Sequence, residues 1–189
     1  MAALICIDMQ NDFCLETSPL CVKGAMSCLP HVKEALATAR KHHMSIFWVI
    51  REHDPSGVDI EWTRKHLCQS GGAGATLPGT TGAALVDGLE ARPGEVVIIK
   101  KRFSAFSHTH LDLVLRRLNV RTVAICGVQT PNCIRATAVD ALGLDYEVVV
   151  LSDATASKSE AVQENNLEDM RCMGIKTPTT HGWAQALMP

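Results

Sequence analysis

The chain has 189 residues, a formal net charge of −2 and a pI near 6.4. This length fits one domain with a sizeable core. The scattered Lys and Arg residues argue against a nucleic-acid partner, which needs a clustered basic surface. No apolar run approaches the roughly 18 residues that span a bilayer, and the first residues lack a basic lead and a cleavage site. We therefore expect a cytoplasmic protein with no membrane partner.

The eight cysteines argue against a disulfide framework. They form no C-x-x-C pair, and Cys6 and Cys126 lie inside apolar runs, where a thiol behaves as a small hydrophobic side chain. This usage is typical of a reducing compartment.

The first part of the chain predicts two buried strands separated by a helix. Ala2–Ile7 is a run of small and branched apolar residues that ends at Asp8, and Ser45–Ile50 is a second run that ends in charged residues. Between them, Leu29–His43 has apolar residues at helical spacing. Ligands bind outside the carboxyl ends of strands in open α/β sheets, which makes Asp8 a site candidate. The alternative is a loop aspartate that caps a turn.

Residues 55–93 predict a loop-rich insertion, with a short helix around Asp59–Leu67. The stretch contains Gly-Gly-Ala-Gly-Ala and Pro-Gly-Thr-Thr-Gly, which are typical of loops. Its glycines match neither phosphate-binding pattern, G-x-x-x-x-G-K-[ST] or G-x-G-x-x-G. Long ordered loops in compact domains are often lids or binding loops, so we expect this insertion to lie near a ligand site.

The remaining half repeats the order strand, loop, helix. The predicted strands are Glu95–Ile99, Thr122–Cys126 and Tyr146–Leu151, with a short edge strand at Gly174–Thr177, and the predicted helices are Thr109–Leu118, one that opens after Cys133, and Ser159–Met173. This order predicts an α/β fold: a single-domain, three-layer α/β/α structure with a mostly parallel central sheet. Periodicity does not reveal the order of the strands in the sheet.

Three predicted strands are followed by chemically useful side chains: Asp8, Lys100 and Cys133. An acid, a cation and a thiol that meet at one edge of the sheet would form an activated nucleophile, because the carboxylate can accept the thiol proton and the ammonium can hold both groups. The start of a helix also favours the thiolate form of Cys133. Taken singly, the cysteine is equally consistent with a structural role, and the lysine with a solvated one.

Four segments together resemble the isochorismatase-like cysteine hydrolases, the superfamily of nicotinamidases, N-carbamoylsarcosine amidohydrolases and ureidoacrylate hydrolases. The segments are Ala-Leu-Ile-Cys-Ile-Asp8-Met-Gln-Asn-Asp-Phe, Lys100-Lys-Arg-Phe-Ser-Ala-Phe-Ser-His-Thr-His-Leu, Cys-Gly127-Val-Gln-Thr-Pro-Asn-Cys133 and Asp153-Ala-Thr-Ala. They occur in the family's order and, with the linking strands, cover nearly the whole chain.

The resemblance implies a catalytic role for each of the three residues. Asp8 would be the general base, Lys100 its charged partner and Cys133 the nucleophile, with a cis peptide bond between Val128 and Gln129 and an oxyanion hole formed by the N–H groups of Gln129 and Cys133. It further implies a hydrolase without a cofactor that cleaves the C–N bond of a small amide, ureide or carbamoyl substrate through a thioester. Relatives are commonly dimers or tetramers, so a homo-oligomer is expected.

The chain departs from the nicotinamidases after its second strand. Nicotinamidases bind a metal there through Asp-x-His followed by further histidines, whereas this chain has Arg51-Glu52-His53-Asp54 and its next histidine at His66. The spacing does not fit, so no metal is expected and nicotinamide becomes a poor candidate substrate. Arg51 and His53 would line the pocket mouth or pair with Asp54.

Substrate-contacting residues are predicted from charge and size. Arg51, Lys101 and Arg102 offer cations for a substrate carboxylate, and Phe13 and Trp62 offer apolar walls. The alternatives are solvation for the cations and core packing for the aromatic residues. Three other functions stay open: a metal-assisted nicotinamidase-type amidase, a binding or scaffold protein without catalysis, and a redox sensor that uses the Cys133 thiol.

Overall fold

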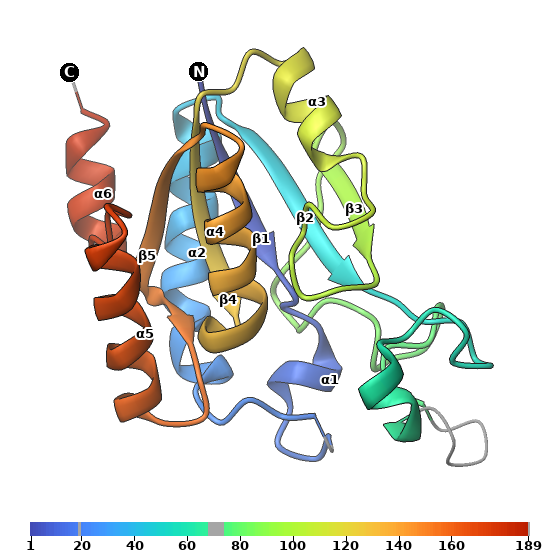
Figure 1. Cartoon of the computed structure of the whole chain (residues 1–189). Helices are drawn as coiled ribbons and strands as arrows, with labels where there is room; N and C mark the ends of the chain where they lie inside the picture. The colour runs from blue at the N-terminus through green and yellow to red at the C-terminus, as the bar shows by residue number, and fades with distance from the viewer. Residues whose placement is uncertain (19, 68–73, 189) are drawn as a thin grey trace.

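Five parallel strands form the central sheet of the protein. The computed structural model describes residues 1–18, 20–67 and 74–188. The strands are β1 (Ala2–Ile7), β2 (Ser45–Arg51), β3 (Val96–Lys100), β4 (Thr122–Val128) and β5 (Glu147–Ala156). Their order is β3-β2-β1-β4-β5, and all four pairings are parallel (Figure 1). The predicted α/β fold is confirmed, and every carboxyl end lies at the same edge of the sheet.

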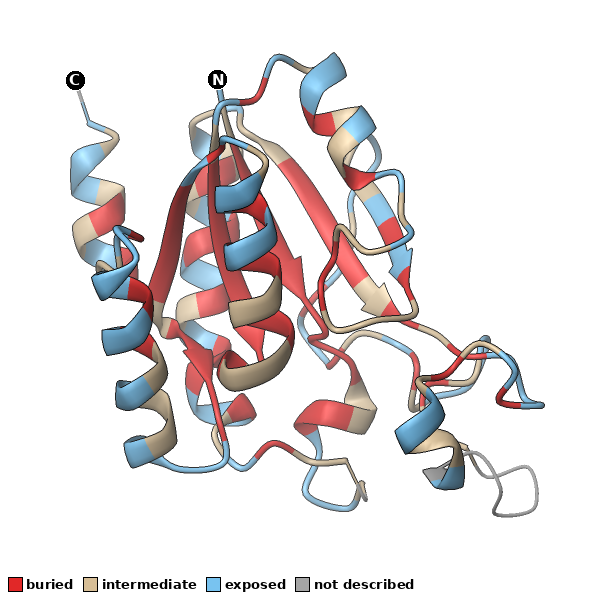
Figure 2. Cartoon of the chain, viewed as in Figure 1, coloured by how far each residue is buried: buried red, intermediate tan, exposed pale blue. Residues whose placement is uncertain are grey.

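Both faces of the sheet are covered, which explains the continuous apolar runs. In β1, Leu4 and Cys6 belong to one core cluster, and Ala3, Ile5 and Ile7 to the cluster on the opposite face. Alternate side chains of a strand point to opposite faces, so a strand buried on both sides has no polar position. Figure 2 shows β1, β2, β4 and β5 as largely buried ribbons and the helices with exposed outer sides, whereas the edge strand β3 has exposed residues.

Helices form the two outer layers. One layer contains α2 (Ala25–Lys41), α6 (Thr180–Ala186) and the short α1 (Asn11–Cys14), and the other contains α3 (Leu111–Arg117), α4 (Arg135–Gly143) and α5 (Glu160–Cys172). This arrangement confirms the three layers.

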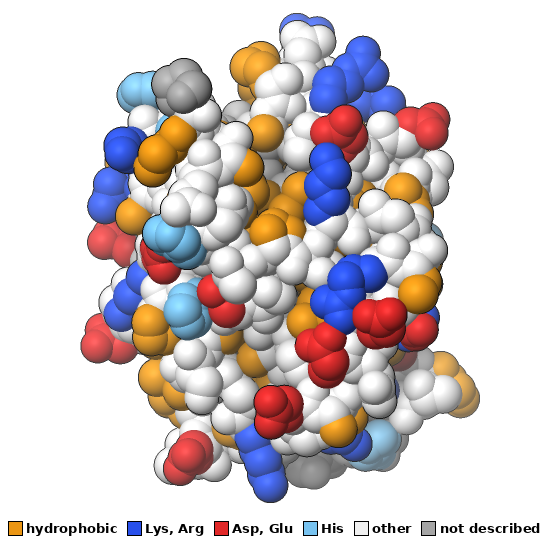
Figure 3. Space-filling view, turned by 90° about the vertical axis from the view of Figure 1, so that its left-hand side faces the viewer, with side chains coloured by type: hydrophobic (Ala, Val, Ile, Leu, Met, Phe, Trp, Pro, Cys, Tyr) orange, Lys and Arg blue, Asp and Glu red, His pale blue; other side chains and the backbone are white. Residues whose placement is uncertain are grey.

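Helix α5 shows how the sequence specifies such a layer. The hydroxyl of Ser159 accepts a hydrogen bond from the N–H of Val162, which caps the amino end of the helix. Leu167 and Met170, three residues apart, are buried against the sheet. On the outer side Arg171 pairs with Glu168 at 2.9 Å. Figure 3 looks onto this side of the molecule and shows acidic and basic side chains next to one another.

Several elements differ from the prediction. Helix α2 begins at Ala25 rather than Leu29, with Pro30 inside it, and the carbonyl deprived of a donor belongs to the exposed Met26. Strand β5 continues to Ala156 instead of ending at Leu151, and the short helices α1 and α6 were not predicted. The segment Gly174–Thr177 forms only one isolated parallel bridge, between Val149 and Lys176, instead of a strand.

The segment between β2 and β3 is loop-rich, as predicted. Its described part contains one short 3₁₀ helix, η1 (Trp62–Leu67), and otherwise turns and bends. Cys68 and the glycines Gly71 and Gly72 lie outside the described residues. No helix in the described ranges has the length and apolar character that crossing a membrane requires.

Candidate active site

Asp8, Lys100 and Cys133 meet at the carboxyl edge of the sheet. Asp8 follows β1, Lys100 is the last residue of β3, and Cys133 lies in η2 (Thr130–Ile134), the π-helical turn between β4 and α4. The Lys100 Nζ lies 2.7 Å from the Asp8 Oδ2 and donates to the Cys133 Sγ at 3.3 Å. All three side chains are buried, and Lys100 is 0% exposed. The structure thus brings together the three residues that the sequence singled out.

Two backbone features allow this convergence. Asp8 has a φ of 53°, and its N–H donates to the Val49 carbonyl at 2.8 Å, so the chain turns sharply where β1 ends. Gly127 pairs with Ile7 and has a φ of 108°, and a Cβ atom there would overlap the Ile7 carbonyl oxygen. Only glycine therefore allows β4 to lie this close to β1 at the point where the chain continues to Cys133.

The environment of the Cys133 thiol opposes its ionisation. Burial raises the pKa of this thiol, the Asp8 carboxylate raises it further, and the nearby charges of Lys100 and Arg51 do not outweigh these effects. Burial and Asp8 therefore oppose the thiolate form that the start of a helix is expected to favour. In the described parts of the chain, the Asp8 carboxylate forms an ion pair with Lys100, and a hydrogen bond between the thiol and Asp8 adds to the raised pKa of Cys133. Asp8 can therefore accept the thiol proton.

The cavity beside these groups is small. Asp8, Gln129 and Cys133 line it, and the peptide bond between Val128 and Gln129 is cis. Its volume is about 30 Å³, roughly that of one water molecule. A substrate must displace side chains at the mouth of the cavity to enter.

Four of the five predicted substrate contacts divide into two groups. Phe13 and Arg51 line the cavity. Trp62 does not: it is 85% exposed, with the Lys65 ammonium 5.4 Å from its ring centroid. Arg102 also lies outside the lining, because its guanidinium donates to the carbonyls of Asp59 (2.7 Å) and Lys101 (2.9 Å). The sequence shows the charge of Arg102, but it does not show that the Arg102 Nη1 donates to two backbone carbonyls.

Arg64 and Phe103 line the cavity although sequence reasoning did not select them. The guanidinium carbons of Arg51 and Arg64 each lie 5.3 Å from the centroid of the Phe103 ring. Phe103 lies within the segment that carries the family resemblance, which could have indicated it. Arg64 lies in η1, where no pattern distinguishes it from neighbouring charged residues.

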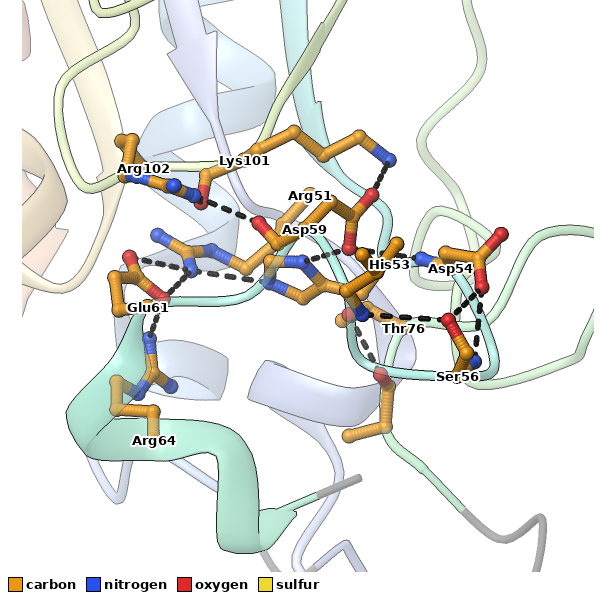
Figure 4. Close-up of polar contacts among 12 residues, drawn as sticks. Arg51, His53, Asp54, Ser56, Asp59, Glu61, Arg64, Thr76, Lys101 and Arg102 are labelled. Carbon is orange, nitrogen blue, oxygen red and sulfur yellow. Dashed lines mark hydrogen bonds and ion pairs between the residues drawn. The ribbon is translucent and has the colours of Figure 1, made fainter. Parts of the chain in front are cut away.

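A network of charged side chains surrounds Arg51 and His53 (Figure 4). The Arg51 Nη1 donates to Glu61 at 3.2 Å, and the His53 Nδ1 lies 3.2 Å from the Asp59 Oδ1. The expected partner of both, Asp54, instead accepts a hydrogen bond from the Ser56 hydroxyl at 2.6 Å.

Further charges complete this network. Lys101, which was predicted to offer a cation to a substrate carboxylate, pairs with Asp59 at 2.8 Å, and Arg64 lies 3.5 Å from Glu61. Arg51 and His53 therefore pair with Glu61 and Asp59, which lie six to ten residues further along the chain, and not with the nearby Asp54.

These residues do not fit a nicotinamidase-type metal ion. The Nε2 of His53 lies 3.3 Å from the Arg51 Nη1, and its Nδ1 is engaged by Asp59, so neither nitrogen is available to a metal. The guanidinium would also repel a divalent cation. Burial, and then the charge of Arg51, lower the pKa of His53. Across residues 1–18, 20–67 and 74–188, no cluster of three potential ligands could hold a metal ion.

Comparisons with known proteins agree with this architecture. Residues 2–181 match the isochorismatase domain family. A protein of Arabidopsis thaliana named a probable inactive nicotinamidase is 45% identical over 187 residues, 98% of this chain and 95% of that one. Ureidoacrylate amidohydrolase RutB of Methylorubrum extorquens is 28% identical over 95% of this chain and 77% of its own. The crystal structure of an isochorismatase family protein from Desulfovibrio vulgaris has a TM-score of 0.95 and 46% identity, covering 98% of this chain and 97% of that chain. The chain therefore belongs to the isochorismatase family of hydrolases.

Proposed function

We propose that the protein hydrolyses the C–N bond of a small amide, ureide or carbamoyl compound through a thioester on Cys133, without a metal ion. The observation that carries this proposal is the position of the Lys100 ammonium, which contacts both the Asp8 carboxylate and the Cys133 sulfur in a buried pocket. Such a contact aligns a base and a nucleophile.

The reaction begins with a neutral thiol. As the Cys133 sulfur bonds to the carbonyl carbon, Asp8 accepts the thiol proton, and Lys100 stabilises the charges that develop on both groups. The N–H groups of Gln129 and Cys133 donate to the tetrahedral oxyanion. The C–N bond then breaks, and Asp8 returns the proton to the departing ammonia or amine.

Water completes the cycle. Asp8 takes a proton from a water molecule whose oxygen attacks the thioester carbon. The carbon–sulfur bond breaks, and the released thiolate regains its proton. The carboxylic or carbamic acid leaves, and Cys133 is again a neutral thiol, the form that its raised pKa favours.

The substrate that we propose is not nicotinamide. The Arg51–His53 pair occupies the place where a nicotinamidase needs metal ligands, and its charge opposes a cation there. The 45% identical Arabidopsis thaliana protein is itself named a probable inactive nicotinamidase.

The second candidate is a family member without catalysis. The comparisons favour it over the catalytic proposal, because a protein aligned over 98% of this chain is named inactive. The geometry favours the first, because all three members of the acid–ammonium–thiol group are present and in contact.

The redox-sensor hypothesis has less support. The buried cysteines Cys6, Cys14, Cys28 and Cys126 belong to the core cluster on the other face of the sheet from Cys133. Burial, followed by the charge of Asp8, raises the pKa of Cys133, which disfavours the thiolate that oxidants attack.

Ammonia release from a panel of linear amides, ureides and nicotinamide tests the proposal. We expect turnover of a linear amide or ureide that Cys133→Ala reduces on the order of 10³-fold or more, with a thioester adduct in the intact-mass spectrum of the wild type. Cys172→Ala, at an exposed thiol, is the matched control and should retain activity.

Three results would reject the proposal. Full activity in Cys133→Ala would exclude the thioester. Turnover of nicotinamide that EDTA abolishes and zinc restores would establish the metal-assisted alternative. The absence of both turnover and adduct across the panel would establish the non-catalytic candidate.

A further inference from the structure

Arg51 is a buried cation with an unused donor. It is 2% exposed and lies at the carboxyl end of β2, in register with Lys100 on β3. Its Nη1 is engaged by Glu61 and His53, whereas its Nη2 is buried and has no hydrogen-bond partner within the described residues. Leaving a charged donor unpaired in the interior is costly. An acceptor supplied by a ligand would remove this cost.

The position of Arg51 is held rigidly by Gln10. The side-chain oxygen of Gln10 accepts from the Arg51 N–H at 2.8 Å, and its amide nitrogen donates to the Arg51 carbonyl at 2.8 Å. Gln10 is itself 0% exposed. The backbone of Arg51 is therefore fixed at the end of β2, and the guanidinium itself is held by His53, Glu61 and the Phe103 ring.

The charges that line the cavity do not balance. Lys100 neutralises Asp8, whereas Arg51 and Arg64 share one carboxylate, that of Glu61. The nearest other carboxylate of the network, Asp59, is already paired with Lys101. Burial, and then the charge of Arg51, lower the pKa of Arg64, as expected where positive charge is in excess. One negative charge on a ligand would complete the balance.

We infer that Arg51 and Arg64 form a carboxylate subsite, so that the substrates are amides, ureides or carbamoyl compounds that also carry a carboxylate. The inference rests on the proposed function for the identity of the reacting group. Phe103 lies against both guanidinium groups and fixes them in the cavity lining. Arginine presents parallel N–H donors that match the two oxygens of a carboxylate.

Glu61 acts as an internal competitor in this arrangement. Both of its oxygens lie within 3.3 Å of the Arg51 Nη1, and it precedes η1, which carries Arg64. A substrate carboxylate replaces Glu61 as the partner of the two arginines, and η1 moves with its side chains to enlarge the 30 Å³ cavity. Removing the charge of Glu61 should therefore strengthen the binding of anions.

Calorimetric titration of Cys133→Ala with succinate, and with succinamide as its neutral counterpart, tests the subsite without requiring catalysis. We expect succinate to bind at least about 10-fold more tightly than succinamide. Adding Arg64→Gln should weaken the binding of succinate by roughly 10- to 100-fold, because one charged hydrogen bond is lost, and should leave the affinity for succinamide unchanged. Adding Glu61→Gln should tighten succinate.

Arg171→Gln, on the outer side of α5, is the matched control and should change neither affinity. Arg64 and Glu61 are only partly buried, so these variants are expected to fold, which far-UV circular dichroism verifies. Equal affinities for succinate and succinamide, an unchanged succinate affinity in the Arg64→Gln background, or weaker succinate binding after Glu61→Gln would overturn the inference.

The test separates the subsite from the proposed reaction. Tight succinate binding to Cys133→Ala, with no hydrolysis of succinamate by the wild type, would retain the subsite and reject the reaction. Hydrolysis of neutral amides without succinate binding would retain the reaction and reject the subsite.

Discussion

Lys100 shows how much of this site depends on one buried charge. Its ammonium is fully enclosed and contacts the Asp8 carboxylate, the Cys133 sulfur and the Arg102 carbonyl. A charge is tolerated at such a position only with compensating partners. The contacts that compensate for burying the Lys100 charge also hold the Asp8 carboxylate beside the Cys133 sulfur.

Replacing Lys100 with Met should impair both stability and turnover. The change leaves the Asp8 carboxylate buried without its counter-ion, which typically costs about 3–5 kcal/mol of unfolding free energy. Urea denaturation measures this cost, and ammonia release measures the loss of turnover. The neighbouring Lys101→Met is the control: its ion pair with Asp59 is partly exposed, so a cost below about 1 kcal/mol is expected. Equal costs in the two variants would contradict this account.

At the scale of elements, Glu95 connects a helix, a strand and a loop. Its carboxylate accepts from Arg40 of α2 at 2.8 and 3.1 Å, from the Trp48 indole of β2 at 2.7 Å and from the Arg92 N–H at 2.9 Å. Burial alone would raise the pKa of Glu95, but these donors outweigh it and lower the pKa to about 2. The ionised carboxylate thus fastens α2 to the sheet edge that carries β3.

Glu95→Gln should lower stability at neutral pH. The pKa of this carboxyl group falls on folding from 4.5 to about 2. Its ionised form therefore stabilises the folded protein at pH values above the unfolded-state pKa, and this stabilisation is lost as the pH decreases towards 2. We expect Glu95→Gln to reduce the unfolding free energy on the order of 2 kcal/mol at pH 7. In a series of urea titrations, the difference in unfolding free energy between wild type and Glu95→Gln should decrease below about pH 5.

The exposed Glu16→Gln provides the comparison and should leave the unfolding free energy at pH 7 nearly unchanged. A Glu95→Gln difference that stays constant from pH 7 to pH 4 would show that the lost hydrogen bonds, and not the charge, are responsible.

At the scale of the whole molecule, one sheet joins the two core clusters. Trp183 of α6 belongs to the cluster on one face, and Leu115 of α3 to the cluster on the other. The strands contribute alternate residues to both. Unfolding either layer would expose the sheet that supports the other, so a single cooperative unit is expected.

Trp183→Ala and Leu115→Ala should therefore lower the midpoint of the same unfolding transition. Costs of about 3–5 and 2–5 kcal/mol respectively are expected for the loss of buried side chains. Circular dichroism and the fluorescence of the remaining tryptophans should report coincident transitions. Leu113→Ala, at an exposed position of the same helix as Leu115, serves as the control and should change little. Separate transitions for the two variants would show that the layers unfold independently.

The strands and the position of Asp8 could be predicted because their signals are local. A buried parallel strand is an unbroken apolar run, and the residue after it lies at the carboxyl edge, which made Asp8 a candidate. Lys100 was distinguished from Lys101 and Arg102 only by the resemblance to the family. The sequence indicated neither that Trp62 lies outside the cavity lining nor that Arg64 lies in it, because both belong to a loop segment where position depends on distant contacts.

By itself, the sequence determined the parallel α/β layers and the acid, cation and thiol at the strand ends, because periodicity and strand termini are properties of neighbouring residues. Only the tertiary structure decided that β1 lies between β2 and β4, that Glu61 rather than Asp54 pairs with Arg51, and that burial raises the pKa of the Cys133 thiol. Pairing and protonation depend on burial and on distances of a few ångströms between segments far apart in the chain, and these exist only once the chain has folded.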